Sequence, residues 1–163
     1  MIVLIRNLIK FCIVNPFLVF LMLIPSVIFA KSPENMNSVV GCWQTVDAKT
    51  HELSSIIEIK PSGKYFIGTI VKTYPQPGEK PSLCKHCKGD DKNKPTLGLT
   101  IIKNMICTPS YCSHGTILDP RHGSVYHATM QLIKGGEFIK VRGYIGIPLL
   151  GRTVVWHRVS LPK

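Results

Sequence analysis

The chain has 163 residues, which fits one domain of ordinary size and is too short for two independent hydrophobic cores. With 45% hydrophobic, 8% aromatic and 18% charged residues, its composition excludes a disordered, collagen-like or low-complexity protein. The formal net charge of +11 favours acidic partners.

The N-terminus has the pattern of a secretory signal peptide over residues 1–30. Arg6 and Lys10 form a basic start, residues 11–24 form an apolar run, and polar sequence follows Ala30. We predict cleavage after Ala30, which leaves one mature domain at residues 31–163.

An uncleaved membrane anchor is the alternative interpretation of this segment. Asn15, Pro16 and Pro25 interrupt the apolar run, which leaves fewer than the roughly 20 apolar residues that a spanning helix needs. We therefore expect no stable membrane span after cleavage. The protein is then periplasmic or secreted.

Short segments rich in β-branched and aromatic residues recur along the mature chain, with turn residues between them. The first three predicted strands are residues 39–46, 54–60 and 64–72, and Pro61-Ser-Gly63 forms the turn between the second and the third. The proline-rich stretch at residues 73–95 predicts an irregular surface excursion.

The second half of the chain continues the strand pattern. The predicted strands, turns and cysteine-bearing segment are, in chain order, a strand at residues 96–103, the segment 104–114, a short strand at 116–118, a turn at 119–123, a strand at 125–132, the Gly135-Gly136 turn, a strand at 139–145 and a closing strand at 151–159.

Alternation along these strands predicts one buried and one solvated face. In residues 125–132 the apolar set that includes Tyr126, Ala128 and Met130 alternates with polar residues. About eight such strands favour a single closed antiparallel β-barrel, because closure removes exposed strand edges. A β-sandwich is the alternative all-β fold.

Cysteines are expected to be oxidised in an exported protein. Cys12 lies in the signal peptide, and Cys42, in an apolar strand, is the candidate for a thiol outside the disulfides. We predict disulfides among the other four, with three pairings open. These four are Cys84, Cys87, Cys107 and Cys112.

Two other interpretations of the cysteines are possible. The four could bind zinc with His86 or His114 nearby, although export favours disulfides over a metal site. Cys84 and Cys87 could form a redox site, but the strand-to-helix context of a thioredoxin motif is missing. We therefore predict no metal site and no cofactor.

The sequence predicts no enzyme. Acidic residues are sparse, the histidines lack metalloprotease spacing, and Asp119 sits in a turn where a carboxylate accepts backbone hydrogen bonds. Nucleic acid is also excluded as a partner, because the lysines are scattered and no arginine-rich helix is evident. An anionic component of the cell envelope fits the charge better, although the lysine-bearing loop at residues 80–94 could simply be solvated.

Several residue strings together resemble the uncharacterised bacterial exported family called domain of unknown function 2147. They are Gly41-Cys-Trp43, Cys84-Lys-His-Cys87, Pro95-Thr-Leu-Gly98, Gly115-Thr-Ile-Leu-Asp119-Pro-Arg-His-Gly123, Val141-Arg-Gly-Tyr-Ile-Gly146 and Leu149-Leu-Gly-Arg152-Thr-Val-Val-Trp156-His-Arg158. The sequence departs from the family pattern by adding Cys107 and Cys112. The resemblance implies an envelope protein and carries no activity with it.

The Gly-x-Trp string at the first strand also resembles the pattern of lipocalins and related calycin barrels. That resemblance implies an arginine packed over Trp43 at one end of the barrel, and Arg158 or Arg152 could supply it. It also implies a small or lipidic ligand in the lumen.

Two functional hypotheses follow. The first is a non-enzymatic barrel that binds a small or lipidic ligand or an envelope component, with the small residues Gly68, Ala128 and Gly143 leaving room in the lumen. Its candidate ligand-binding residues are Trp43, Phe66, Tyr126, Met130, Val141 and Trp156. The second is an envelope interaction or structural module that uses an exposed basic surface of Arg142, Tyr144 and Arg152.

Overall fold

The structure is a computed structural model that describes residues 36–47, 50–75, 78 and 80–160. The predicted signal peptide, residues 1–30, lies outside the described residues. No helix in the described part of the chain has both the length and the apolar character needed to cross a membrane.

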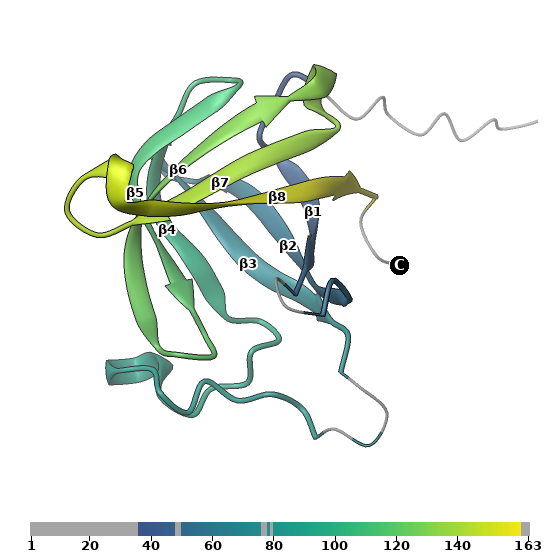
Figure 1. Cartoon of the computed structure of the whole chain (residues 1–163), viewed down its shortest axis with the longest axis vertical. Helices are drawn as coiled ribbons and strands as arrows, with labels where there is room; N and C mark the ends of the chain where they lie inside the picture. Colours follow the sequence, from purple (N-terminus) through teal and green to yellow (C-terminus); the bar gives the residue numbers. More distant parts are fainter. Residues whose placement is uncertain (1–35, 48–49, 76–77, 79, 161–163) are drawn as a thin grey trace, which may run out of the picture. The chain divides into compact units, whose positions relative to one another are not determined.

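The described residues form a closed barrel of eight antiparallel strands in sequence order, which confirms the predicted fold and excludes the sandwich (Figure 1). Each strand pairs with the next, and the last pairs with the first. The strands are β1 (Gly41–Val46), β2 (Leu53–Ser62), β3 (Tyr65–Thr73), β4 (Thr100–Cys107), β5 (Tyr111–Asp119), β6 (Ser124–Ile133), β7 (Phe138–Tyr144) and β8 (Gly151–Val159).

Strand boundaries differ from the sequence prediction in several places. The strand predicted at residues 96–103 is β4, which begins only at Thr100 and ends at Cys107. Pro61 and Ser62 continue β2 and pair with β3, so the turn falls at Gly63, whose φ of 60° suits glycine. The segment 104–114 is a hairpin between β4 and β5. Three short 3-10 turns complete the described elements: η2 (Gly89–Asp91), η3 (Lys134–Gly136) and η4 (Pro148–Leu150).

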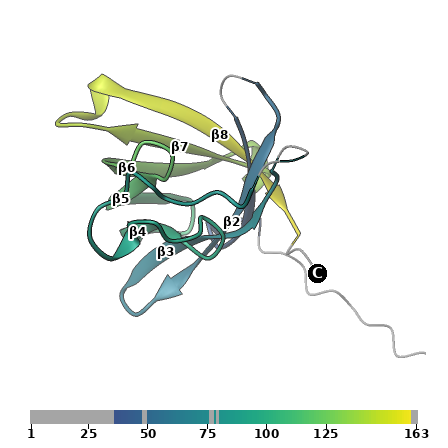
Figure 2. The same cartoon turned by 90° about the horizontal axis from the view of Figure 1, so that it is seen from below.

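The order of the strands gives the barrel two different ends (Figure 2). The closed end carries the β2–β3, β4–β5 and β6–β7 turns together with residues 36–40, which lead into β1. The open end carries the β1–β2, β3–β4, β5–β6 and β7–β8 connections, of which β3–β4 is the longest. Alternating inward-facing residues such as Ile59, Met130 and Ile139 are buried and fill the barrel near the closed end.

Trp43 and Arg158 seal the closed end. They are register partners on β1 and β8, and the Arg158 guanidinium carbon lies 4.2 Å from the centroid of the Trp43 ring. That guanidinium donates hydrogen bonds to the carbonyls of Gly136, Val40 and Ser38 at 2.7, 3.0 and 2.6 Å. Of the two arginines expected over Trp43, the structure therefore selects Arg158.

The four cysteines expected to be oxidised lie in two pairs at disulfide distance. Cys84 pairs with Cys87 across 5.3 Å between Cα atoms, in the β3–β4 connection at the open end. Cys107 pairs with Cys112 across 4.0 Å, next to the β4–β5 turn at the closed end. The two pairs lie at opposite ends of the barrel, so the four sulfurs do not converge on one metal position. Cys42 is buried in β1, outside both pairs.

Candidate functional site

A cavity of about 1310 Å³ opens at the open end of the barrel. Its lining comes from the lumen and from all four connections of that end. Ligand pockets usually enclose roughly 300–1,000 Å³ of concave, mainly apolar space. The barrel therefore has room for a ligand above its packed closed end.

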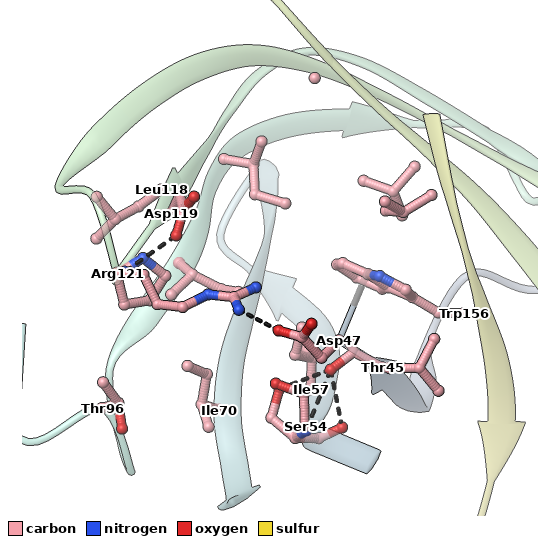
Figure 3. Close-up of a pocket in the computed structure, with 18 of the residues that line it drawn as sticks. Thr45, Asp47, Ser54, Ile57, Ile70, Thr96, Leu118, Asp119, Arg121 and Trp156 are labelled. Atoms are coloured by element: carbon pink, nitrogen blue, oxygen red, sulfur yellow. Dashed lines mark hydrogen bonds and ion pairs between the residues drawn. The ribbon is translucent and has the colours of Figure 1, made fainter. Parts of the chain in front are cut away.

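The inner wall of the cavity is apolar. Its buried lining residues include Ile57, Ile70, Leu118 and Trp156, which are labelled in Figure 3. Ile101 and Val141 are also buried in this lining. Gly143 on β7 also lines it, and a Cβ built there would sit at ordinary contact distance, 3.5 Å, from the Tyr126 Cβ. The glycine therefore leaves lumen space that a larger side chain would occupy.

A buried hydroxyl pair interrupts this apolar wall. The Thr45 and Ser55 hydroxyls lie 2.8 Å apart, and the Ser55 amide donates to the Thr45 hydroxyl at 3.1 Å. Thr45 is only 8% exposed and lines the cavity. The pair is satisfied internally, because a buried hydroxyl without a partner would destabilise the fold.

The β5–β6 turn places charged groups at the rim of the cavity. Gly123, with a φ of 66°, allows its amide to donate to the Asp119 carbonyl at 2.8 Å. The Asp119 carboxylate accepts the Arg121 amide at 3.0 Å and lies 2.8 Å from His122 Nδ1. Burial by itself raises the pKa of Asp119, but these two hydrogen bonds and the neighbouring cations outweigh it and hold that pKa below its ordinary value.

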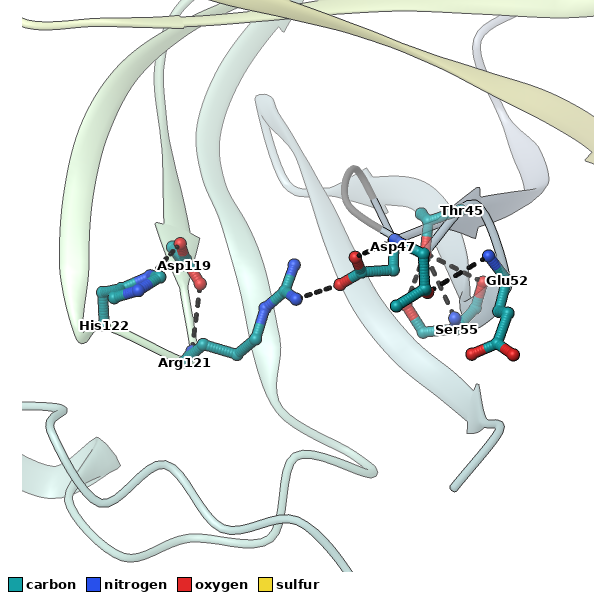
Figure 4. A network of polar contacts seen from close by, with 8 residues as sticks. Thr45, Asp47, Glu52, Ser55, Asp119, Arg121 and His122 are labelled. Atoms are coloured by element: carbon teal, nitrogen blue, oxygen red, sulfur yellow. Dashed lines mark hydrogen bonds and ion pairs between the residues drawn. The ribbon is translucent and has the colours of Figure 1, made fainter. Parts of the chain in front are cut away.

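An ion pair crosses the mouth of the cavity. The Arg121 guanidinium binds the Asp47 carboxylate in the β1–β2 connection, 74 positions earlier in the chain (Figure 4). β1 and β5 lie four strands apart in a ring of eight, so the pair joins opposite walls of the barrel. Asp47 is positioned for this by accepting the Thr50 amide at 3.0 Å.

The rim also presents exposed cations. Lys80 and Lys85 from the β3–β4 connection and Arg152 at the start of β8 all line the cavity and are exposed. Among the carboxylates of the lining, Asp47 is paired with Arg121, Asp119 is hydrogen-bonded to His122, and Glu52 is exposed. With Arg121 included, the four cations of the lining outnumber its three carboxylates, so the mouth carries net positive charge.

The structure divides the six candidate ligand-binding residues into two sets. Tyr126, Val141 and Trp156 line the cavity. Trp43 and Met130 belong to the packed core toward the closed end, and Phe66 is half-buried against that core, so these three are outside the cavity lining. Sequence reasoning also missed the mouth residues Asp47 and Arg121, although the Asp-Pro-Arg-His-Gly turn marked the position of Arg121.

The candidate interaction surface is exposed only in part. Arg152 is exposed, whereas Arg142 and Tyr144 are half-buried, which differs from the sequence expectation. The Arg142 guanidinium is occupied by hydrogen bonds to the Pro148 carbonyl at 2.7 Å, the Leu149 carbonyl at 3.1 Å and the Thr153 hydroxyl at 2.8 Å. Arg142 therefore supports the β7–β8 connection.

Comparison with known proteins agrees with this geometry. The family model described as "Uncharacterized protein conserved in bacteria (DUF2147)" matches residues 41–158. Among solved structures, protein HP1028 from the human pathogen Helicobacter pylori, described as belonging to the lipocalin family, is similar with a TM-score of 0.65. Its sequence identity is 17%, over 76% of this chain and 84% of that chain, so the likeness establishes the lipocalin-like fold. No curated protein matches significantly.

Proposed function

We propose, from the premise that the chain belongs to the bacterial DUF2147 family, that it is an exported, non-enzymatic protein whose barrel binds a small amphipathic ligand. The observation that supports this most is the cavity of about 1310 Å³ at the open end of a lipocalin-like barrel. Its ligand has an apolar body and an anionic head group.

The apolar body of the ligand fits the inner wall. Removing apolar surface from water contributes roughly 25 cal/mol per Å², and the wall formed by residues such as Ile70, Leu118 and Trp156 offers that burial. A ligand there needs few hydrogen bonds, because the Thr45 and Ser55 hydroxyls already satisfy each other.

The anionic head fits the mouth. Arg121 holds Asp47 across the opening, and an anionic head group can take the place of that carboxylate on the same guanidinium. Arg121 is paired in both states, and the displaced Asp47 carboxylate keeps its hydrogen bond from the Thr50 amide. Lys80, Lys85 and Arg152 add attraction for an anion at the rim.

The test uses two probes with the same chain and different heads, laurate and dodecanol. Binding is followed by quenching of tryptophan fluorescence, since Trp156 lines the cavity whereas Trp43 is sealed at the closed end. Gly143→Leu places a side chain in the lumen and is expected to weaken both probes about tenfold or more. Lys140→Leu, on the exposed face of the same strand, is the matched control and leaves both affinities unchanged.

The charge of the head is tested separately. Arg121→Gln is expected to weaken laurate and leave dodecanol unchanged, and Asp47→Asn to strengthen laurate because it removes the competing carboxylate. Native mass spectrometry of the purified protein then looks for a co-purifying mass. If Gly143→Leu binds both probes as well as the unmodified protein, the lumen is not the binding site.

A further inference from the structure

The β7–β8 connection, residues 145–150, forms an exposed apolar tip. The three most exposed large apolar side chains in the described part of the chain all belong to it. Leu149 is 80% exposed, Leu150 75% and Ile145 68%, and Ile147 is 56% exposed. Scattered apolar residues are normal on protein surfaces, but a cluster of this density marks an interaction site.

The apolar tip is held in place by hydrogen bonds. Arg142 binds the carbonyls of Pro148 and Leu149, and the Leu150 amide donates to the Ile147 carbonyl at 3.1 Å within η4. The tip projects beyond the barrel wall in both views, as the yellow turn at the left of Figures 1 and 2. Its apolar side chains are therefore presented outward by a fixed backbone, which lowers the entropy lost on binding.

The charged side chains on the two strands that flank the apolar tip are all basic. Residues 138–160 contain Lys140, Arg142, Arg152 and Arg158 and no aspartate or glutamate. Arg152 follows the tip directly and is exposed. Apolar side chains beside the exposed Arg152, with the exposed Lys80 and Lys85 on the rim of the same cavity, complement a lipid surface that carries anionic head groups.

We infer that the apolar tip docks onto the surface of a lipid bilayer that contains anionic lipids. Ile147 and Leu149 enter the boundary between head groups and acyl chains, and Arg152 contacts the anionic head groups. Because Ile145 and Leu150 also line the cavity, docking places the mouth against the bilayer. The inference stands independently of whether the lumen binds a ligand.

The test is flotation of the purified protein with vesicles of phosphatidylcholine, with and without phosphatidylglycerol. The double variant Ile147→Ser, Leu149→Ser changes two tip residues outside the cavity lining. Its affinity for the mixed vesicles is expected to fall about tenfold or more. The variant Ile106→Thr, at a 53% exposed apolar position near the closed end, is the matched control and should float like the unmodified protein.

Further variants separate charge, folding and ligand binding. Arg152→Gln is expected to remove the preference for phosphatidylglycerol. Leu149→Glu changes the apolar tip at an 80% exposed position and disturbs no packed residue, so a loss of flotation in this variant does not arise from misfolding. Because Ile147 and Leu149 are outside the cavity lining, laurate binding should not change in the double variant.

Two results would overturn the inference. One is the absence of flotation by the unmodified protein, or equal flotation of the double variant. The other is a dimer in solution that the double variant converts to a monomer, because the tip would then bind a second copy of the chain.

Discussion

Removing the Arg158 guanidinium is expected to destabilise the whole barrel. Arg158→Met keeps an apolar stem of similar length against the Trp43 ring and deletes the charge, the three hydrogen bonds and the contact at 4.2 Å. Arg158 is only 7% exposed, so water is largely kept from the position that the guanidinium leaves.

The expected loss follows from what each partner can do afterwards. Gly136 is buried, so its carbonyl loses the hydrogen bond from Arg158 and water cannot replace it, which destabilises the fold by about 1–3 kcal/mol. Val40 is exposed and Ser38 half-buried, so water can reach their carbonyls, and each bond lost there is worth about 0.5–1.5 kcal/mol. The cation over the indole adds about 0.5–2 kcal/mol. Together these contributions predict a decrease of about 2.5–8 kcal/mol in the free energy of unfolding, a large part of a typical total.

The measurement is urea unfolding with the disulfides intact, followed by tryptophan fluorescence. Arg152→Met is the matched control, because Arg152 lies on the same strand and is exposed, and it should change stability by less than about 0.5 kcal/mol. If the free energy of unfolding of Arg158→Met lies within about 1 kcal/mol of that of the unmodified protein, Arg158 does not hold the closed end together.

Three further predictions concern the open end and the disulfides. Gly123→Ala should lower the free energy of unfolding in urea by about 2–4 kcal/mol, because Gly123 has a φ of 66° and a Cβ there would collide with a backbone carbonyl of the β3–β4 connection. Gly63 has a similar φ of 60° but open space around it, so Gly63→Ala should lower it by only about 1 kcal/mol. Because the pKa of Asp119 is lowered in the folded protein, its carboxylate contributes stability that is fully present above pH 3.8, the ordinary value, and is lost as the pH falls through the folded-state pKa. The difference in stability between the unmodified protein and Asp119→Asn, less than about 1 kcal/mol in thermal unfolding, should therefore disappear on acidification. A difference that does not depend on pH would contradict this. The intact mass of the exported protein should be lower than that of the reduced chain by about four hydrogens. The double variant Cys107→Ser, Cys112→Ser should lose about 2 kcal/mol of folding stability, because that disulfide closes a loop with a sequence separation of 5. Free thiols at all four positions would contradict the pairing.

The positions of the strands could be predicted because a strand with one buried face shows a local alternation of apolar and polar residues. Residues 125–132 alternate cleanly, and β6 spans Ser124–Ile133. The hairpin between β4 and β5 was harder, since Thr108 and Pro109 interrupt the pattern only briefly between two cysteines. The closed end was predictable from Gly-x-Trp and a late arginine, although the choice between Arg158 and Arg152 needed the register of β8 against β1.

The candidate site was predictable only as a face of the strands. Alternation indicates that Trp43 and Trp156 both point inward, but it does not tell which half of the lumen is packed and which is open. The ion pair between Asp47 and Arg121 joins connections 74 positions apart, so it depends on how the strands tilt around the barrel. No local pattern in the sequence encodes such a contact.

The seam between β1 and β8 also determines the order in which the chain can be completed. Every other strand pair joins neighbours in the sequence, whereas the hydrogen bonds from Arg158 to Val40 and Ser38 span 118 and 120 positions. Contacts this distant bear the largest loop-closure entropy, so the circle closes after the local hairpins have formed. Until β8 is in place, β1 and β7 both present unpaired edges, so a chain truncated before residue 151 is expected to be an open sheet prone to pairing with other copies.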